Sequence, residues 1–386
     1  MRGYNPFSPI DIKITSAIEG LIYLNELLDN KKHVLLVATR NTIERCKLNK
    51  WLHAFIDGRK NLWFYNIPSN PGVADVVSTL KDLTTYKIDT ILSIGGGSCI
   101  DLAKAISALK NNVNDSELNT ETIREVIKTK SYSTNPYFID IIAIPTTSGT
   151  GSEVTRWATV WDPEMHAKLS IEHNALYPKA AIIIPEFTLS MPARLTLSTG
   201  LDALSHAMEA FWAKSRNLLS QALALEAIGL IKENLPLALS YPSDIKFREG
   251  MAMGSLIAGL AFSMTRTTAC HSISYPLTMR FGIEHGFAAA ISLDEVARRN
   301  TVAVPEIASI YSIFDNEQGF SAWLNQICEN IQPLKLSHFG VKLDSIEVLV
   351  NETFTQGRMD NNPILFTRDD VNEILSCIFN NNVKSL

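Results

Sequence analysis

The pattern of hydrophobic residues changes near residue 185, and this change constrains the fold more than any other feature of the chain. Before it, short runs rich in branched aliphatic residues alternate with helical stretches. The runs are residues 34–38, 90–94, 140–144 and 180–184. Such alternation is typical of a parallel sheet with crossover helices. After residue 185 strand-like runs nearly vanish and long helical patterns follow. We therefore expect an α/β domain with a mostly parallel sheet over 1–185 and an all-helical domain over 186–386.

The composition is that of a well-buried globular protein, and it excludes several classes of function. Hydrophobic residues make up 46% of the 386 residues, and charged residues make up 19%. The net charge of −5 and the absence of a basic run argue against nucleic-acid binding. The sequence shows no signal peptide and no stretch that could span a bilayer. Five scattered cysteines are typical of reduced thiols, so we expect a cytoplasmic protein without membrane partners.

Two polar turns follow predicted strands. The first reads GGGS and consists of Gly95, Gly96, Gly97 and Ser98. Glycines permit positive φ and a close ligand, and the free N–H groups of a helix that begins here would face an anion. The second turn, TTSGTGSE, carries the hydroxyls of Thr146, Thr147, Ser148 and Thr150. A GGGS turn alone could be an ordinary tight turn, but two such loops at strand ends favour a nucleotide site.

Four residues of the second half form a candidate metal site. Asp202 and His206 are four residues apart, so on a helix they project from one face. His271 and His285 lie further along the chain. One carboxylate and three imidazoles are suited to Fe(II) or Zn(II), and unsuited to Mg or Ca. A single histidine is more often a core or surface residue than a ligand, so the prediction depends on the set.

The motifs GGGSxxDxAK, TTSGTGSE, GLDALSHAMEA and EHG occur in this order, and together they resemble the iron-containing (group III) alcohol dehydrogenases. The resemblance extends from about residue 10 to 300. It implies an α/β nucleotide-binding domain, a helical domain, an active site in the cleft between them, and the four metal ligands named above. It also implies cofactor contacts by Asn70, by the glycine turn, by Asp101 near the ribose and by Lys168.

The chain departs from the family pattern at two places. The family often has a second histidine near the nicotinamide, four residues after the first; here this residue is Tyr275, which either donates a proton or only packs. Many members have an acidic residue after the second strand that excludes a 2′-phosphate. Thr39 stands there with Arg40 beside it, so both NAD(H) and NADP(H) remain possible.

The residues around His271 bear on the substrate. Arg266 and Thr267 precede it, and Arg156 follows the TTSGTGSE loop. A guanidinium with nearby hydroxyls favours an anionic substrate, although arginines often serve surface ion pairs instead. The string CHSISYPLT resembles the phosphonoacetaldehyde reductase branch of the family, which belongs to phosphonate metabolism. We therefore expect a metal-dependent NAD(P)-linked reductase of a small anionic aldehyde.

Other functions remain open at this point. A reductase of lactaldehyde, butanal or succinic semialdehyde is the nearest alternative, and a glycerol- or maleylacetate-type reductase is another. A dehydroquinate synthase-like lyase would use three protein ligands, and the Asp202–His206 pair argues against it. A non-catalytic metal- or nucleotide-binding protein is a further alternative. A homodimer is compatible with the sequence.

Overall fold

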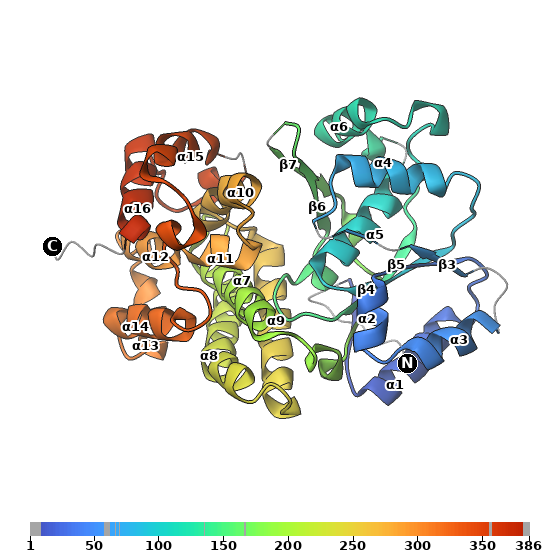
Figure 1. Cartoon of the computed structure of the whole chain (residues 1–386), viewed down its shortest axis with the longest axis horizontal. Helices are drawn as coiled ribbons and strands as arrows, with labels where there is room; N and C mark the ends of the chain where they lie inside the picture. The colour runs from blue at the N-terminus through green and yellow to red at the C-terminus, as the bar shows by residue number, and fades with distance from the viewer. Residues whose placement is uncertain are drawn as a thin grey trace. The chain divides into compact units, whose positions relative to one another are not determined.

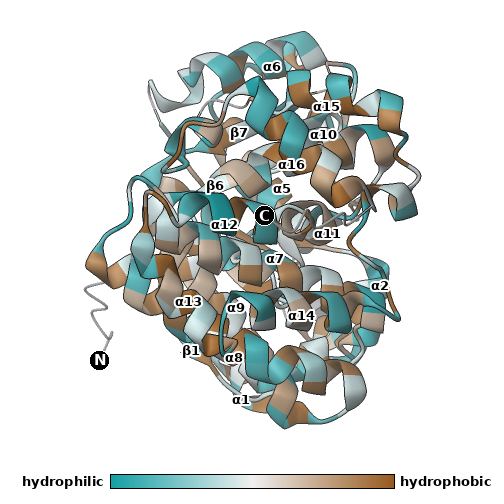
Figure 2. Cartoon of the chain, turned by 90° about the vertical axis from the view of Figure 1, so that its left-hand side faces the viewer, coloured by the Kyte–Doolittle hydropathy of each residue, from teal (hydrophilic) through white to brown (hydrophobic). Residues whose placement is uncertain are grey.

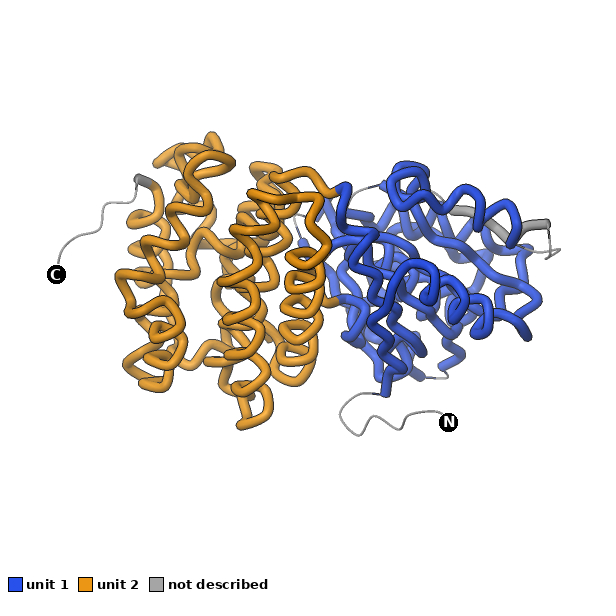
Figure 3. Tube along the Cα trace, turned by 90° about the horizontal axis from the view of Figure 1, so that it is seen from below, with its two compact units in different colours: residues 1–147, 152–190 blue, residues 148–151, 191–386 orange. Residues whose placement is uncertain are grey.

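A computed structural model of the chain describes residues 9–57, 62–65, 67–68, 70–134, 136–165, 167–354 and 357–380. The chain divides into two compact units (Figures 1 and 3). The first comprises residues 1–147 and 152–190, and the second comprises residues 148–151 and 191–386. The first unit contains the strands, whereas the described part of the second is helical. The expected fold class, a parallel α/β domain followed by a helical one, is confirmed.

The first unit contains a six-stranded parallel sheet with the strand order β1-β8-β5-β4-β2-β3. A separate antiparallel hairpin consists of β6 and β7. The strands are β1 (Asp11–Ile14), β2 (Val34–Ala38), β3 (Leu62–Tyr65), β4 (Thr90–Gly95), β5 (Asp140–Pro145), β6 (Trp157–Asp162), β7 (Ala167–Glu172) and β8 (Ala180–Ile183). The four predicted strands are β2, β4, β5 and β8. The hydrophobic pattern does not predict the other four.

Helices cover both faces of this sheet (Figure 1). They are α1 (Ala17–Leu28), α2 (Arg40–Arg45), α3 (Asn49–Asp57), α4 (Val73–Asp82), α5 (Gly97–Leu109) and α6 (Thr120–Thr129). Side chains alternate between the faces along β2. Leu35 and Val37 pack into a core with α4, α5 and α6, whereas Leu36 packs into a second core with Leu24 of α1. Because both faces are buried, the central strands read as continuous hydrophobic runs.

The second unit is a helical assembly around α7. Its helices are α7 (Ala193–Trp212), α8 (Leu218–Ser240), α9 (Ile245–Thr265), α10 (Ala269–Phe281), α11 (His285–Ala290), α12 (Leu293–Asn300), α13 (Ala308–Ile313), α14 (Glu317–Cys328), α15 (Ile346–Glu352) and α16 (Arg368–Asn380). Helix α7 packs against α8, α9 and α11. Hydrophobic and hydrophilic residues alternate along the helices in Figure 2. None of the described helices has the length and hydrophobicity to cross a membrane.

The two predicted turns follow β4 and β5, so both lie at the carboxyl end of the parallel sheet. From β2 the chain crosses to β3 on one side and then to β4 on the other, so the order reverses between β2 and β4. Open α/β sheets bind nucleotides at such a reversal, beyond the carboxyl ends of the strands. Gly95, Gly96 and Gly97 do not have the positive φ that glycine permits, and the close approach of a ligand to them stays a prediction. Space is what requires Gly95: a β-carbon there would lie 2.2 Å from Sγ of Cys99.

A buried lysine holds the segment after the second turn to α5. Lys104 is fully buried, and its ammonium group donates to the carbonyl oxygen of Ser152 at 2.6 Å. It also donates to Oγ1 of Thr155 at 3.0 Å and to the carbonyl oxygen of Trp157 at 2.9 Å. Burial lowers the pKa of Lys104 to about 8. This lysine of the GGGSxxDxAK motif therefore joins α5 to the start of β6.

We expect Lys104→Met to destabilise the α/β unit. Methionine fills similar space but removes the ammonium group that donates to four acceptors of the protein, which should lower the free energy of unfolding by about 2–5 kcal/mol. Calorimetry should show a lower melting temperature for this variant. The matched control is Lys110→Met at the end of the same helix, where only a 3.4 Å bond to Thr84 is lost. Equal melting temperatures for the two variants would contradict the assigned role.

Candidate active site

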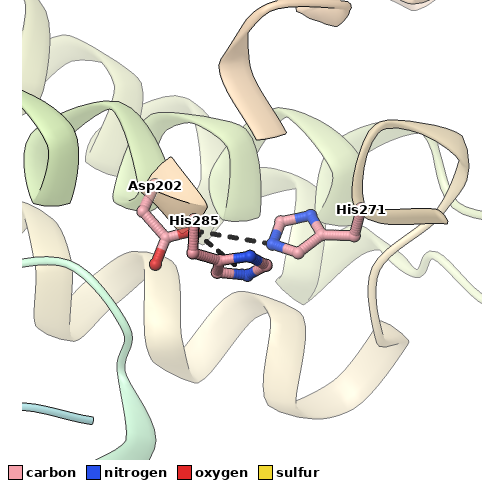
Figure 4. A group of neighbouring side chains, drawn as sticks. All are labelled: Asp202, His271 and His285. Carbon is pink, nitrogen blue, oxygen red and sulfur yellow. Dashed lines mark ion pairs between the residues drawn. The ribbon is translucent and has the colours of Figure 1, made fainter. Parts of the chain in front are cut away.

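Three histidines surround one carboxylate oxygen in the helical unit. Nε2 of His271 lies 3.6 Å from Oδ1 of Asp202. Nε2 of His206 and Nε2 of His285 each lie 3.9 Å from the same oxygen. Figure 4 shows how Asp202, His271 and His285 point toward one another from different elements. The structure therefore brings together the four residues predicted as metal ligands.

Helix packing sets the position of each of these side chains. Asp202 and His206 lie one turn apart on α7, His271 lies on α10, and His285 is the first residue of α11. Gly286 allows α11 to approach α7 closely, because a β-carbon there would lie 1.8 Å from the carbonyl oxygen of Ser198. This backbone contact holds His285 beside Asp202.

His206 is oriented by its surroundings. Its Nδ1 lies 3.3 Å from the carbonyl oxygen of Gly149, which is a suitable acceptor for an Nδ1–H donor. Its ring stacks on Phe262 with centroids 4.1 Å apart and on His271 at 4.6 Å. Burial lowers the pKa of His206 to about 4, so the ring is neutral at physiological pH. With the proton on Nδ1, the lone pair of Nε2 faces Asp202.

Glu209 orients His271 in the same way, and it is a functional residue that the motif analysis misses. The side chain is fully buried on α7. Its Oε2 accepts a short hydrogen bond from Nδ1 of His271, while its Oε1 accepts from the backbone N–H groups of Thr268 at 3.0 Å and Cys270 at 2.9 Å. The Thr268 hydroxyl donates to Oε1 at 2.7 Å and accepts from the Trp212 indole at 3.0 Å. A carboxylate on Nδ1 leaves Nε2 to bind a metal.

The residues present fit a metal ion. Oδ1 of Asp202 and Nε2 of His271 are buried atoms without a hydrogen-bond partner among the described residues. Buried polar atoms normally have such a partner, so two such acceptors aimed at one point indicate a cation-binding site. Ligand atoms on a tetrahedron with 2.0–2.2 Å bonds lie about 3.4 Å apart, close to the separations found here. Burial acts to lower the pKa of His271, but Glu209 and Asp202 outweigh it and raise the pKa to about 9. A metal ion would replace that proton.

Several of the predicted cofactor residues lie at the carboxyl end of the sheet in the first unit. Gly96 precedes α5 without a side-chain cap, so the first amides of that helix are left for an anion. Thr147 lies against it, because a β-carbon on Gly96 would be 3.1 Å from Oγ1 of Thr147. Asn70, with φ of 52°, donates its backbone N–H to Oγ of Ser98 at 3.1 Å. Thr146 donates its N–H to the carbonyl oxygen of Gly95 at 3.1 Å.

Other predicted cofactor residues make contacts within the protein. Thr39 caps α2, and its Oγ1 accepts from the N–H of Thr42 at 3.0 Å. Asp101 accepts from Oγ of Ser152 at 2.6 Å and from the N–H of Thr159 at 3.0 Å. The ammonium group of Lys168 lies 5.5 Å above the ring of Trp161, its partner across the β6–β7 hairpin. Their contacts with a cofactor stay predictions.

Ser148 and Thr150, which were also predicted to contact the cofactor, lie in the segment 148–151 that packs with the helical unit. This segment requires glycines at two positions. A β-carbon on Gly149 would lie 2.6 Å from the carbonyl oxygen of Thr199. Gly151 has φ of +58°, and its β-carbon would lie 2.6 Å from Cα of Gly259. Close packing therefore accounts for both glycines of the TTSGTGSE motif.

The predicted substrate residues have distinct surroundings. Arg266 ends α9 and is half-buried. Thr267 is buried, and its carbonyl oxygen accepts from Asn361 at 3.1 Å. Arg156 forms an ion pair with Glu172 at 3.2 Å. Tyr275 is buried on α10, and its ring stacks on that of His285 with centroids 6.3 Å apart. A substrate contact by any of them stays a prediction.

Two family models match the chain. The description "Iron-containing alcohol dehydrogenase" covers residues 14–185, and "Fe-containing alcohol dehydrogenase family, C-terminal" covers residues 196–379. The chain is 33% identical over 323 residues to the NAD-dependent methanol dehydrogenase of Bacillus methanolicus, covering 80% of this chain and 81% of the relative. The chain belongs to the iron-containing alcohol dehydrogenase family. It is therefore an oxidoreductase of the NAD-linked alcohol dehydrogenase and aldehyde reductase type.

Further similarities show the range of this family. The 1,3-propanediol dehydrogenase of Citrobacter freundii is 32% identical over 330 residues, or 82% of each chain. Among solved structures, a sulfoacetaldehyde reductase from Bifidobacterium kashiwanohense in complex with NAD+ superimposes with a TM-score of 0.84. It is 27% identical and covers 98% of this chain and 99% of its own. The alcohol dehydrogenase described here thus resembles relatives named for both charged and uncharged substrates.

We expect Gly286→Ala to weaken metal binding. The added methyl group meets the Ser198 carbonyl and must push α11, with His285, away from Asp202. Metal content after dialysis, measured by elemental analysis, should fall about tenfold or more. Gly229→Ala on α8 is the control, since a β-carbon there meets nothing within 4 Å. Full metal retention by Gly286→Ala would contradict the assigned packing role.

A second expectation concerns Glu209→Gln, which preserves size and removes charge. The glutamine oxygen can still accept from the 268–270 backbone, but its NH2 group then faces Nδ1 of His271. The histidine must accept there and carry its proton on Nε2, where the metal should bind. Metal affinity, measured by competition with a chromophoric chelator, should fall about 10- to 100-fold. Glu226→Gln, an exposed position on α8, should leave the affinity unchanged. Equal affinities in both variants would refute the tautomer argument.

Proposed function

We propose that this alcohol dehydrogenase reduces a small anionic aldehyde, such as phosphonoacetaldehyde to 2-hydroxyethylphosphonate, with NADH or NADPH and a bound Fe(II) or Zn(II). The observation that carries the substrate class is Arg266, a half-buried guanidinium five residues before His271. Similarity to a sulfoacetaldehyde reductase supports the same class, because sulfonate and phosphonate are both tetrahedral oxyanions.

The backbone of Arg266 supports a functional role. Its φ of 64° and ψ of 177° lie in a region that is populated almost only by glycine. A non-glycine residue in this region costs about 1–3 kcal/mol, and such strain is concentrated at functional sites. A structural residue with no other task could be replaced by glycine without this cost. We infer that ligand binding by the side chain helps to offset this cost.

The residues of the chain have separate tasks in this reaction. Asp202 and the three histidines would hold the metal ion, and Glu209 keeps Nε2 of His271 available for it. When bound, the metal withdraws electron density from the aldehyde oxygen, and the reduced nicotinamide supplies the hydride. Arg266 binds the remote anionic group, which aligns the carbonyl group in the site.

Tyr275 is suited to supply the proton. Its phenolic oxygen accepts a hydrogen bond from Nε of Arg358 at 3.3 Å, which leaves the O–H hydrogen to point elsewhere. Its ring lies flat against His285, at 13° between the planes. This supports proton donation by Tyr275 over a role in packing alone.

Reduction of an uncharged aldehyde is the second candidate function. The curated relatives named above act, by their names, on methanol and 1,3-propanediol, and their identity of 32–33% exceeds that of the sulfoacetaldehyde reductase. The two candidates differ in what Arg266 does. An enzyme for butanal would gain nothing from a strained guanidinium in its substrate site.

The test is a panel of phosphonoacetaldehyde, succinic semialdehyde, lactaldehyde and butanal, with each nicotinamide cofactor. The wild type should prefer phosphonoacetaldehyde. Arg266→Ala should lower kcat/KM for this substrate by about 10- to 1000-fold, because a charged hydrogen-bond pair loses one partner. The effect on butanal should be slight, and loss of nicotinamide absorbance reports both rates.

Two controls separate binding from folding and from metal loss. Arg266→Gly, which adopts this φ without strain, should lose the same discrimination while its melting temperature does not fall. Enzyme stripped of metal by a chelator should lose turnover of every aldehyde and regain it with Fe(II). A wild type that prefers butanal to every anionic aldehyde would refute the proposed substrate class.

A further inference from the structure

Arg358 is an arginine of the helical unit whose hydrogen bonds are to uncharged groups. Its Nε donates to the phenolic oxygen of Tyr275 at 3.3 Å, and its Nη1 donates to the carbonyl oxygen of Gly357 at 2.9 Å. It is half-buried, and no carboxylate forms an ion pair with it within the described ranges. By contrast, Arg280, on the same helix as Tyr275, is paired with Glu352. The charge of Arg358 is therefore available to pair with an anionic group that binds beside Tyr275.

The contact with Tyr275 places Arg358 beside the candidate metal site. Tyr275 follows His271 by one turn on α10, and its ring stacks on His285, two of the residues around Asp202. Arg358 contacts the hydroxyl end of that ring. The guanidinium is therefore one side chain away from the metal ligands.

The guanidinium group of Arg266 also lies near this part of the chain. A β-carbon on Gly357 would lie 3.3 Å from Nη1 of Arg266, so the Arg266 head group lies against this glycine. Gly357 has φ of +75°, a conformation that disfavours a side chain at this position. Two guanidinium groups beside one residue form a cationic site that attracts an anion.

We propose that Arg358 is a second binding residue for the head group of the substrate, and that together with Arg266 it selects a tetrahedral oxyanion. This inference rests on the proposed function and narrows its substrate class to phosphonates and sulfonates. A planar carboxylate is satisfied by one guanidinium with two parallel hydrogen bonds. A phosphonate or sulfonate has three oxygens directed apart, so it can accept hydrogen bonds from Arg358 and Arg266 from different sides.

The experiment compares substrate ratios in matched variants. For wild type, Arg358→Gln, Arg358→Lys and Arg280→Gln, kcat/KM is measured with phosphonoacetaldehyde, succinic semialdehyde and butanal. Arg358→Gln should lower the ratio of phosphonoacetaldehyde to butanal by about 10- to 100-fold, the effect of losing one charged hydrogen bond. The ratio of succinic semialdehyde to butanal should change much less. Arg358→Lys should restore part of the loss, and Arg280→Gln should match the wild type.

A binding measurement reports the affinity for the head group without any contribution from the chemical step. Methylphosphonate and methanesulfonate carry the tetrahedral head group without an aldehyde, and acetate carries a planar carboxylate instead. Calorimetric titration of the enzyme–NAD+ complex should show tighter binding of the first two in the wild type. In Arg358→Gln this preference should disappear, while the affinity for NAD+ stays unchanged.

The possible failures are distinguishable. A wild type that prefers butanal overturns the proposed function and this inference with it. If the wild type prefers anionic aldehydes and Arg266→Ala abolishes this preference, but Arg358→Gln behaves like Arg280→Gln, only the role of Arg358 is refuted. An equal loss with all three aldehydes in Arg358→Gln also refutes it, since Arg358 would then act on Tyr275 or on the fold.

Discussion

The helical unit depends on the buried negative charge of Asp202, which requires a positive charge beside it. Oδ1 of Asp202 has no hydrogen-bond donor among the described residues, yet three imidazole nitrogens lie within 3.9 Å of it. Such an arrangement is stable only when a cation occupies its centre or when protons on the rings take its place. The surrounding contacts follow from this need, because each ring must turn the same nitrogen inward. A carbonyl oxygen orients His206, a carboxylate orients His271, and close helix packing positions His285.

Much of the fold could be predicted from the sequence because both faces of the central sheet are buried. Strands β2, β4, β5 and β8 are continuous aliphatic runs, and such runs are easily found. Strand β1 reads DIKI and its residues are partly exposed, so its hydrophobic signal is weak. The hairpin β6–β7 contains Asp162, Lys168 and Glu172, whose charges hide the pattern. What decides β1 is its pairing with β8, far along the chain, and a local pattern does not record this pairing.

The candidate site likewise contains residues that could be predicted from the sequence and residues that could not. The four metal-site residues could be predicted, since their chemistry is unusual and their spacing fits a helix. Glu209 was missed because a glutamate on a helix is usually exposed. Its position held a signal, however: Asp202, His206 and Glu209 follow the spacing i, i+4, i+7 and share one face of α7. Lys104 illustrates the opposite case, because a lysine in a nucleotide-site motif invites a role in ligand binding while its bonds are to the protein backbone.

Tyr275 and Arg358 are best understood together. Where the family resemblance leads one to expect a histidine, a guanidinium lies within hydrogen-bond distance of the side chain. An imidazole beside that charge would bind its proton less readily and would be a poor relay. A phenol is neutral, accepts the guanidinium N–H, and still has a proton to give. A chain that places an arginine here to hold an anionic substrate therefore needs a tyrosine at position 275, so the departure from the family pattern and the proposed specificity have one physical cause.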